Sequence, residues 1–164
     1  MKGVRYTYAL LTGADLGNRE DALNQAYSLI GERIGSIKKA SNLHETEPWG
    51  FQSDTKFLNQ AILVESTLKP EEVLTRILEI ELEIGRIRSA AQWTSRIIDI
   101  DILCAENIIH HSDTLNIPHK YLHERSFALK PLCEIAPDWT HPLLRQSYLQ
   151  LLAEIESPTV ETVA

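Results

Sequence analysis

The pattern of apolar and polar residues is typical of strands in four stretches of the chain, and apolar residues recur at helical spacing in two others. Strands are predicted at residues 4–11, 37–46, 57–66 and 96–104, and apolar and polar residues alternate most clearly in the last. The helical spacing predicts one helix that opens at the N-cap Asn18 and ends before Gly35. A second predicted helix has Pro70 in its first turn and ends at Gly85. The order of elements is therefore strand, helix, strand, strand, helix, strand.

This order matches a split βαβ arrangement. We expect the α+β class: a ferredoxin-like βαββαβ core with an antiparallel sheet, helices packed on it, and C-terminal helical additions at about 121–134 and 148–155. Residues 12–17 contain two glycines and are expected to form a turn after the first strand. No linker or repeat divides the chain, so we expect a single domain over 1–164, with a frayed tail after about residue 157.

Composition and charge narrow the class of protein. The 164 residues are 43% hydrophobic and 24% charged, which is ordinary for a globular domain. The net charge of −7 and the lack of a basic cluster argue against nucleic-acid binding. No stretch approaches the roughly 20 apolar residues of a membrane span, and the N-terminus lacks the apolar region of a signal peptide. We expect a cytoplasmic monomer in which Cys104 and Cys133 are buried thiols.

Two aspartates in the fourth strand are the first candidates for chemistry. Asp99 and Asp101 project from one strand face about 7 Å apart along the chain, while Ile98, Ile100 and Ile102 project from the other. Neighbouring carboxylates repel each other, and a hard cation removes that cost. Magnesium favours carboxylates combined with substrate phosphate oxygens, so the pair suits magnesium with a nucleoside triphosphate. The alternative is a half-exposed strand whose polar face happens to carry two aspartates.

Basic residues precede this strand. Arg86, Arg88 and Arg96 lie between the second helix and the aspartates, and a guanidinium matches phosphate oxygens with two hydrogen bonds. The alternative for these arginines is simple charge balance in an acidic chain. His119 follows a proline and is a candidate hydrogen-bond donor to phosphate, or a local turn residue. The chain lacks a G-x-x-x-x-G-K-[ST] phosphate loop and a G-x-S-x-G nucleophile motif.

Several motifs in a fixed order carry a family resemblance over about residues 8–137. They are LTGADLG (11–17), ETEPWG (45–50), FLN (57–59), IE (80–81), GRIR (85–88), Trp93, RIIDIDIL (96–103), IPH (117–119) and RSFALKPLCEIAP (125–137). With these motifs the chain resembles the 6-hydroxymethyl-7,8-dihydropterin pyrophosphokinase family of folate biosynthesis. The resemblance implies an ATP-dependent diphosphotransferase that converts ATP and 6-hydroxymethyl-7,8-dihydropterin into the pterin diphosphate and AMP.

The resemblance also assigns roles by position. It implies that Asp99 and Asp101 bind two Mg2+ ions and act in catalysis with Arg86 and Arg96, and that the loop over 86–96 closes over ATP. The pterin contacts it implies are Thr46, Glu47, Trp49, Phe57, Asn59, Asp99 and Phe127. The ATP contacts it implies are Arg88, Trp93, Arg96, Ile102, His119 and Arg125.

Two other function classes are consistent with parts of the pattern. A nucleotidyltransferase also uses an Asp-x-Asp strand after a glycine turn, but it attacks the α-phosphorus and releases pyrophosphate. A non-catalytic ferredoxin-like binding module would show no ATP turnover, since a fold does not fix a function. The nucleotide product distinguishes all three.

Overall fold

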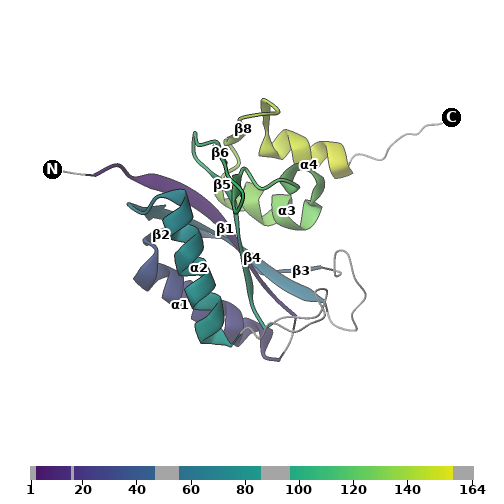
Figure 1. Ribbon diagram of the computed structural model, residues 1–164. Helices are drawn as coiled ribbons and strands as arrows, with labels where there is room; N and C mark the ends of the chain where they lie inside the picture. The colour runs from purple at the N-terminus through teal and green to yellow at the C-terminus, as the bar shows by residue number, and fades with distance from the viewer. Residues whose placement is uncertain (1–2, 16, 47–55, 86–96, 157–164) are drawn as a thin grey trace.

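A five-stranded sheet with helices on both faces forms the framework of the molecule, as the computed structural model shows (Figure 1). The structure describes residues 3–15, 17–46, 56–85 and 97–156. The main elements are β1 (Tyr6–Ala14), α1 (Arg19–Arg33), β2 (Ser36–Ala40), β3 (His44–Thr46), β4 (Phe57–Ser66), α2 (Pro70–Ile84) and β5 (Asp99–Ala105). They are followed by β6 (His110–His111), β7 (Asn116–Ile117), the 3-10 helix η1 (Leu122–Glu124), α3 (Ser126–Ile135), β8 (Thr140–His141), β9 (Gln146–Ser147) and α4 (Tyr148–Glu156).

The sheet is antiparallel at every pairing in the described residues. Its strand order is β2-β4-β1-β5, with β3 also paired to β4. The order of the elements is the one predicted, and the third strand, the second helix and the last helix fall close to their predicted bounds. The mixed α and β class with an antiparallel sheet is therefore confirmed.

Two strand predictions were wrong in detail. Residues 12–14 were expected in a turn, but they continue β1, because both β4 and β5 pair with this segment. Ladder hydrogen bonds on both sides outweigh the turn preference of Gly13. The single strand expected over 37–46 is divided into β2 and β3. In the gap between them, the backbone amide of Ser41 donates a hydrogen bond to the Ala61 carbonyl at 2.8 Å.

The two faces of the sheet carry two apolar clusters. Tyr8, Leu10 and Ile62 pack under α1 and α2. The alternate residues of these strands, including Ala9 and Leu11, point to the other face and pack against α3 and α4. This division follows from the alternation of side chains along a strand. Figure 1 shows α1 and α2 on one side of β1 and β4, and α3 and α4 on the other.

Capping residues set the helix ends largely as expected. The Asn18 side chain accepts a hydrogen bond from the Asp21 amide at 3.0 Å, and Gly85 adopts the left-handed conformation with φ 111°. Gly35 follows the C-cap Ile34, as expected, and its amide donates to the Ile30 carbonyl at 3.3 Å. It has a second role that the sequence did not indicate. A Cβ at this position would lie 2.0 Å from the Glu65 carbonyl oxygen of β4, so glycine is required by the close approach of two backbones.

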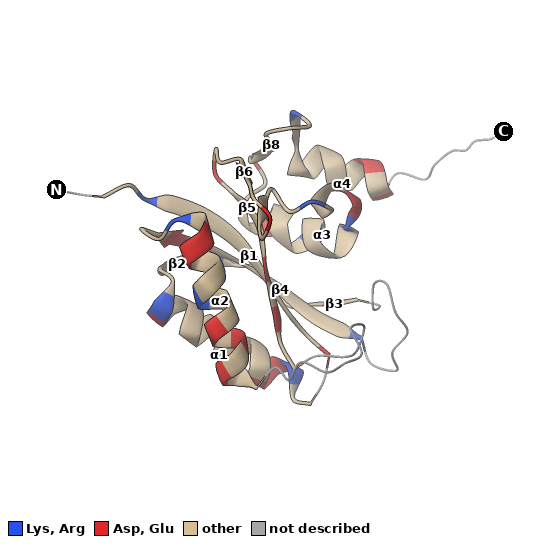
Figure 2. Ribbon diagram, in the orientation of Figure 1, with Lys and Arg blue, Asp and Glu red and all other residues tan. Residues whose placement is uncertain are grey.

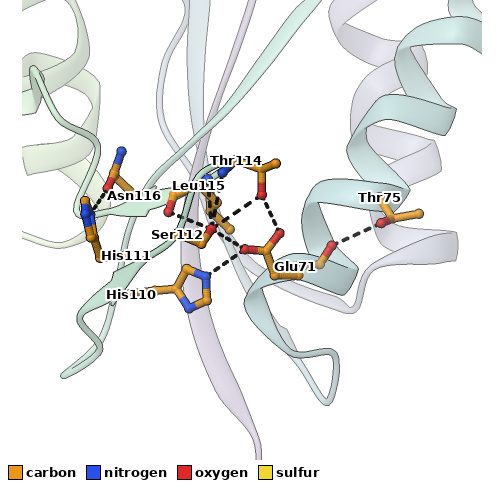
Figure 3. Close-up of polar contacts among 8 residues, drawn as sticks. All are labelled: Glu71, Thr75, His110, His111, Ser112, Thr114, Leu115 and Asn116. Carbon is orange, nitrogen blue, oxygen red and sulfur yellow. Dashed lines mark hydrogen bonds and ion pairs between the residues drawn. The ribbon is translucent and has the colours of Figure 1, made fainter.

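A carboxylate at the start of α2 holds the β6–β7 hairpin (Figure 3). Glu71 accepts hydrogen bonds from Ser112 Oγ at 2.6 Å and Thr114 Oγ1 at 2.9 Å, and it pairs with His110 Nε2 at 2.8 Å. These bonds lower the pKa of Glu71 to about 2, and the bond from Ser112 contributes most. The hairpin is thereby fixed just before the segment that leads to His119.

The cysteine and membrane expectations have different outcomes. Cys104 is buried, as expected, and burial raises the pKa of its thiol to about 12. Cys133 is only half-buried. Among the helices in the described part of the chain, none has the length and hydropathy needed to cross a membrane.

Gly35 provides a test of the sheet packing. We expect Gly35→Ala to destabilise the protein by about 2 kcal/mol or more, because the Glu65 backbone cannot move away without disturbing β4. The matched control is Gly31→Ala on α1, where the new Cβ would meet only Ile37 Cδ1 at 3.6 Å. There we expect a gain of up to about 1 kcal/mol from helix propensity. Equal urea-unfolding free energies for the two variants would contradict this account.

Candidate functional site

Four paired residues form a row across one face of the sheet. Gly13 on β1 pairs with Asn59 on β4 and with Asp99 on β5, and His44 on β3 pairs with Asn59. Directly paired residues present their side chains on the same face. Because Gly13 has no side chain, the Asn59 amide lies directly against the backbone of β1, between β4 and the carboxylate of Asp99. A Cβ at Gly13 would lie 2.7 Å from Asn59 Oδ1, so only glycine fits beside this amide.

The Asn59 side chain has a fixed orientation. It is only 3% exposed, and its Nδ2 donates a hydrogen bond to Thr46 Oγ1 at 2.8 Å. With the amide in this orientation, its Oδ1 lies next to the Gly13 backbone. The structure brings together Thr46 and Asn59, two residues that the resemblance had placed at one ligand.

The aspartate pair lies beside this row. Asp99 and Asp101 are half-buried on β5, while Ile98, Ile100 and Ile102 are buried in the cluster under α1 and α2, as their alternation predicts. Within the described residues, no group of three or more His, Cys, Asp or Glu side chains is arranged to hold a metal. Two carboxylates still suit magnesium, which commonly takes its remaining ligands from water and substrate phosphates.

Two phenylalanines from different elements lie on the face of the sheet that carries Asn59. Phe57 begins β4 opposite Thr46, and Phe127 lies in the first turn of α3. Both rings are half-buried. The Arg125 guanidinium lies 5.5 Å from the centroid of the Phe127 ring, in cation–π range.

A carboxylate on α3 fixes this helix to the strands. Glu134 Oε1 accepts a hydrogen bond from the backbone amide of Asn42 at 2.8 Å, and Oε2 pairs with His44 Nε2. The helix that carries Phe127 is therefore tied to the strand that carries Thr46. The sequence motif contained Glu134, but nothing in it indicated this contact.

His119 is held by its backbone and by one ring nitrogen. Its amide donates to the Leu103 carbonyl at 2.7 Å, and its Nδ1 accepts from the Tyr121 amide at 3.2 Å. The proton of the neutral ring is therefore on Nε2. Burial, followed by the charge of Arg125, lowers the pKa of His119 to about 4 against the opposing effect of Asp99. At neutral pH His119 is an uncharged donor close to Asp99.

The remaining predicted site residues divide into two groups. Ile102 has its side chain in the core at 4% exposure, so only its main chain is available to a ligand. The others lie outside the described residues: Glu47, Trp49, Arg86, Arg88, Trp93 and Arg96.

Sequence reasoning missed two site residues. Gly13 was expected in a turn, and only its strand register reveals its place between Asn59 and Asp99. Glu81 on α2 is 3% exposed and accepts a hydrogen bond from the Ile100 amide at 2.8 Å. The available signal was its place among the apolar positions of the helix, where a carboxylate is unusual.

Comparison with known proteins places the chain among pterin enzymes. Residues 9–137 match the family model described as 7,8-dihydro-6-hydroxymethylpterin-pyrophosphokinase (HPPK). Two similar proteins are both named 2-amino-4-hydroxy-6-hydroxymethyldihydropteridine pyrophosphokinase. The one from Aquifex aeolicus is 34% identical over 85% of this chain and 86% of its own length. The one from Porphyromonas gingivalis is 38% identical over 81% of this chain and 92% of its own.

The fold is also similar to solved structures. The wild-type Plasmodium falciparum HPPK-DHPS with SDX-DHP superposes with a TM-score of 0.74 at 18% identity. The match covers 93% of this chain and 45% of that one, so the chain spans about half the length of this structural relative. At this identity the likeness supports the fold alone.

The protonation state of His119 can be tested directly. We expect its ring to titrate near pH 4 in the folded protein, against 6.5 for the ordinary side chain. Because the folded pKa is depressed, the contribution of the neutral ring to stability is complete above about pH 6.5 and is lost as pH falls toward 4. An NMR titration of the histidine rings measures this value, with His119→Gln to assign the signal and the exposed His111→Gln as a control. A His119 midpoint near 6.5 would contradict the assignment.

Proposed function

The chain belongs to the 7,8-dihydro-6-hydroxymethylpterin-pyrophosphokinase family, and from this premise we propose that it transfers diphosphate from ATP to 6-hydroxymethyl-7,8-dihydropterin. Membership makes the protein a pyrophosphate-transferring enzyme of folate biosynthesis. The observation that carries the site assignment is the row of Asn59, Gly13 and Asp99 beside Asp101. In this proposal an oriented amide, a glycine without a side chain and two carboxylates face one substrate and its metal.

The pterin is proposed to lie over Gly13, on the face of the sheet that carries Asn59 and Asp99. A flat polar bicycle requires aromatic faces for stacking and a fixed polar group for orientation. Phe57 and Phe127 supply the faces in this proposal, supported by their half-buried rings on the face of the sheet that carries Asn59. Asn59 Oδ1 supplies the polar contact, supported by the bond from its Nδ2 to Thr46. Glu47 and Trp49 complete the predicted pterin contacts and stay predictions.

Asp99 and Asp101 are proposed to hold Mg2+, with two ions expected when ATP is bound. Their support is the chemistry of the donor set: two carboxylate side chains on one strand face, both reachable from solvent. The metal, when bound, neutralises phosphate charge. Asp99 also lies in register with Gly13, so in the proposed complex it faces the hydroxymethyl group of the pterin.

ATP is proposed to lie beside β5, where the neutral His119 donates from Nε2 to a phosphate oxygen and Arg125 adds charge. The pterin hydroxyl oxygen forms a bond to the β-phosphorus and releases its proton to solvent. The bond from the β-phosphorus to the oxygen that bridges it to the α-phosphorus breaks, and AMP leaves with that oxygen. The protein contributes positioning and charge rather than covalent chemistry. The main chain of Ile102, and the roles of Arg86, Arg88, Trp93 and Arg96, stay predictions.

The remaining expectations belong to the same proposal. The strand order β2-β4-β1-β5, with antiparallel neighbours, supports the ferredoxin-like description of the core. Monomeric state and cytoplasmic location stay predictions. A single catalytic domain over the chain stays a prediction as well.

Product analysis tests the function. With Mg2+, ATP and 6-hydroxymethyl-7,8-dihydropterin, we expect the protein to form AMP and the pterin diphosphate. Asp99→Asn and Asp101→Asn should each reduce the rate by at least about 100-fold while retaining the fold, because both remove charge from a half-buried face of β5. Chromatography of the nucleotides measures the first result, and thermal melting checks the fold.

The matched control is Asp138→Asn, an exposed aspartate that should leave the rate unchanged. Formation of pyrophosphate instead of AMP would identify a nucleotidyltransferase and refute the proposal. Absence of turnover by the folded wild-type protein would also refute it.

The Gly13 position gives a separate test of the pterin site. We expect Gly13→Ala to raise KM for the pterin about tenfold or more with little change in KM for ATP, because the new Cβ would displace Asn59 Oδ1. Gly3→Ala adds the same methyl group where no atom lies within 4 Å and should change neither constant. A folded Gly13→Ala variant with an unchanged KM for the pterin would exclude Gly13 from the site.

A further inference from the structure

One buried carboxylate of α2 differs from its acidic neighbours. Figure 2 shows α2 as a helix rich in acidic residues. Glu79 pairs with Arg76 and Glu83 with Arg33, and these pairs are exposed to solvent. Glu81 instead is 3% exposed. Burying a carboxylate costs several kcal/mol unless hydrogen bonds or charges offset it. The position therefore calls for a specific reason.

One hydrogen bond of Glu81 indicates why a carboxylate is buried at this position. Its Oε2 accepts from the amide of Ile100 at 2.8 Å, and this bond is buried. Ile100 is the residue between Asp99 and Asp101. Among the described strands, β5 pairs only with β1, so it forms one edge of the sheet. Glu81 thus bonds to the edge strand between its two aspartates.

We propose that Glu81 is a positioning residue for the aspartate pair, an inference that rests on the proposed function of that pair. Side-chain direction in a strand follows the backbone, so rotation of the peptide at Ile100 would turn both neighbouring carboxylates. The buried Ile100 side chain anchors this point in the core, and β1 pairing holds one edge. The Glu81 bond holds the backbone at the edge that β1 does not cover.

The strength of this bond depends on the acceptor at position 81. A carboxylate accepts an amide hydrogen bond about twice as strongly as a neutral amide oxygen does. Glutamine would keep an acceptor in place with a weaker bond, whereas alanine would remove it. The two substitutions therefore separate positioning by hydrogen bonding from an effect of charge alone.

The experiment compares Glu81→Ala, Glu81→Gln and wild type, with Glu79→Ala as the exposed control on the same helix. Hydrogen exchange of the Ile100 amide is measured by NMR. Binding of Mg2+ is measured by calorimetry with a non-hydrolysable ATP analogue, so neither measurement requires turnover. The Mg2+ dependence of AMP formation is measured separately.

For Glu81→Ala we expect Ile100 exchange at least about tenfold faster than in wild type, and Mg2+ affinity about 10- to 100-fold weaker, the range for losing a group that orients a metal ligand. Glu81→Gln should lie between alanine and wild type in both measurements, and Glu79→Ala should match wild type. If Glu81→Ala does not fold, Glu81→Gln replaces it in the test. It should then show faster Ile100 exchange and weaker Mg2+ binding than both wild type and Glu79→Ala.

A folded Glu81→Ala with wild-type Mg2+ affinity would overturn the proposal. So would a Glu81→Gln that keeps the Ile100 amide protected yet binds Mg2+ as weakly as the alanine variant, because charge would then be the cause. Failure of the proposed function is distinguishable, since wild-type protein would then form no AMP whatever the Glu81 variants do.

Discussion

The pairing register of β1 with both of its neighbours is the constraint on which the site depends. It puts Gly13 between Asn59 of β4 and Asp99 of β5, so that residues distant in the sequence share one face of the sheet. A shift of one residue would turn every one of these side chains to the other face. The register is secured by the two apolar clusters, because a shift of one residue would exchange Leu10 and Leu11 between them and disrupt the packing of both.

The helices on the site face are held by polar contacts as well as by apolar packing. Glu134 ties α3 to the segment before β3, which fixes the helix that carries Phe127 relative to the strands that carry Asn59. Glu81 reaches β5 from α2 on the opposite side of the sheet. The site therefore draws its rigidity from both layers, as preorganised binding of a small rigid substrate requires.

Sequence patterns predicted the elements whose signals are local. The strand at 57–66, the helix caps at Asn18 and Gly85, and the facing of Asp99 and Asp101 all follow from periodicity and capping chemistry. The features that the patterns failed to predict depend on tertiary contacts. Gly13 has turn propensity, but pairing on both sides makes it a strand residue. The short hairpins β6–β7 and β8–β9 have strands of two residues, too short for any period. Glu81 and Glu134 act through partners that only the fold brings near.

We propose that the pterin lies over Gly13 and that the adjacent aspartates hold the metal. The most direct test is a crystal structure with 6-hydroxymethyl-7,8-dihydropterin, Mg2+ and a non-hydrolysable ATP analogue. The account predicts the bicycle over Gly13, hydrogen-bonded to Asn59, with Mg2+ between Asp99, Asp101 and the phosphates. A pterin bound elsewhere, or phosphates whose metal contacts neither aspartate, would contradict it.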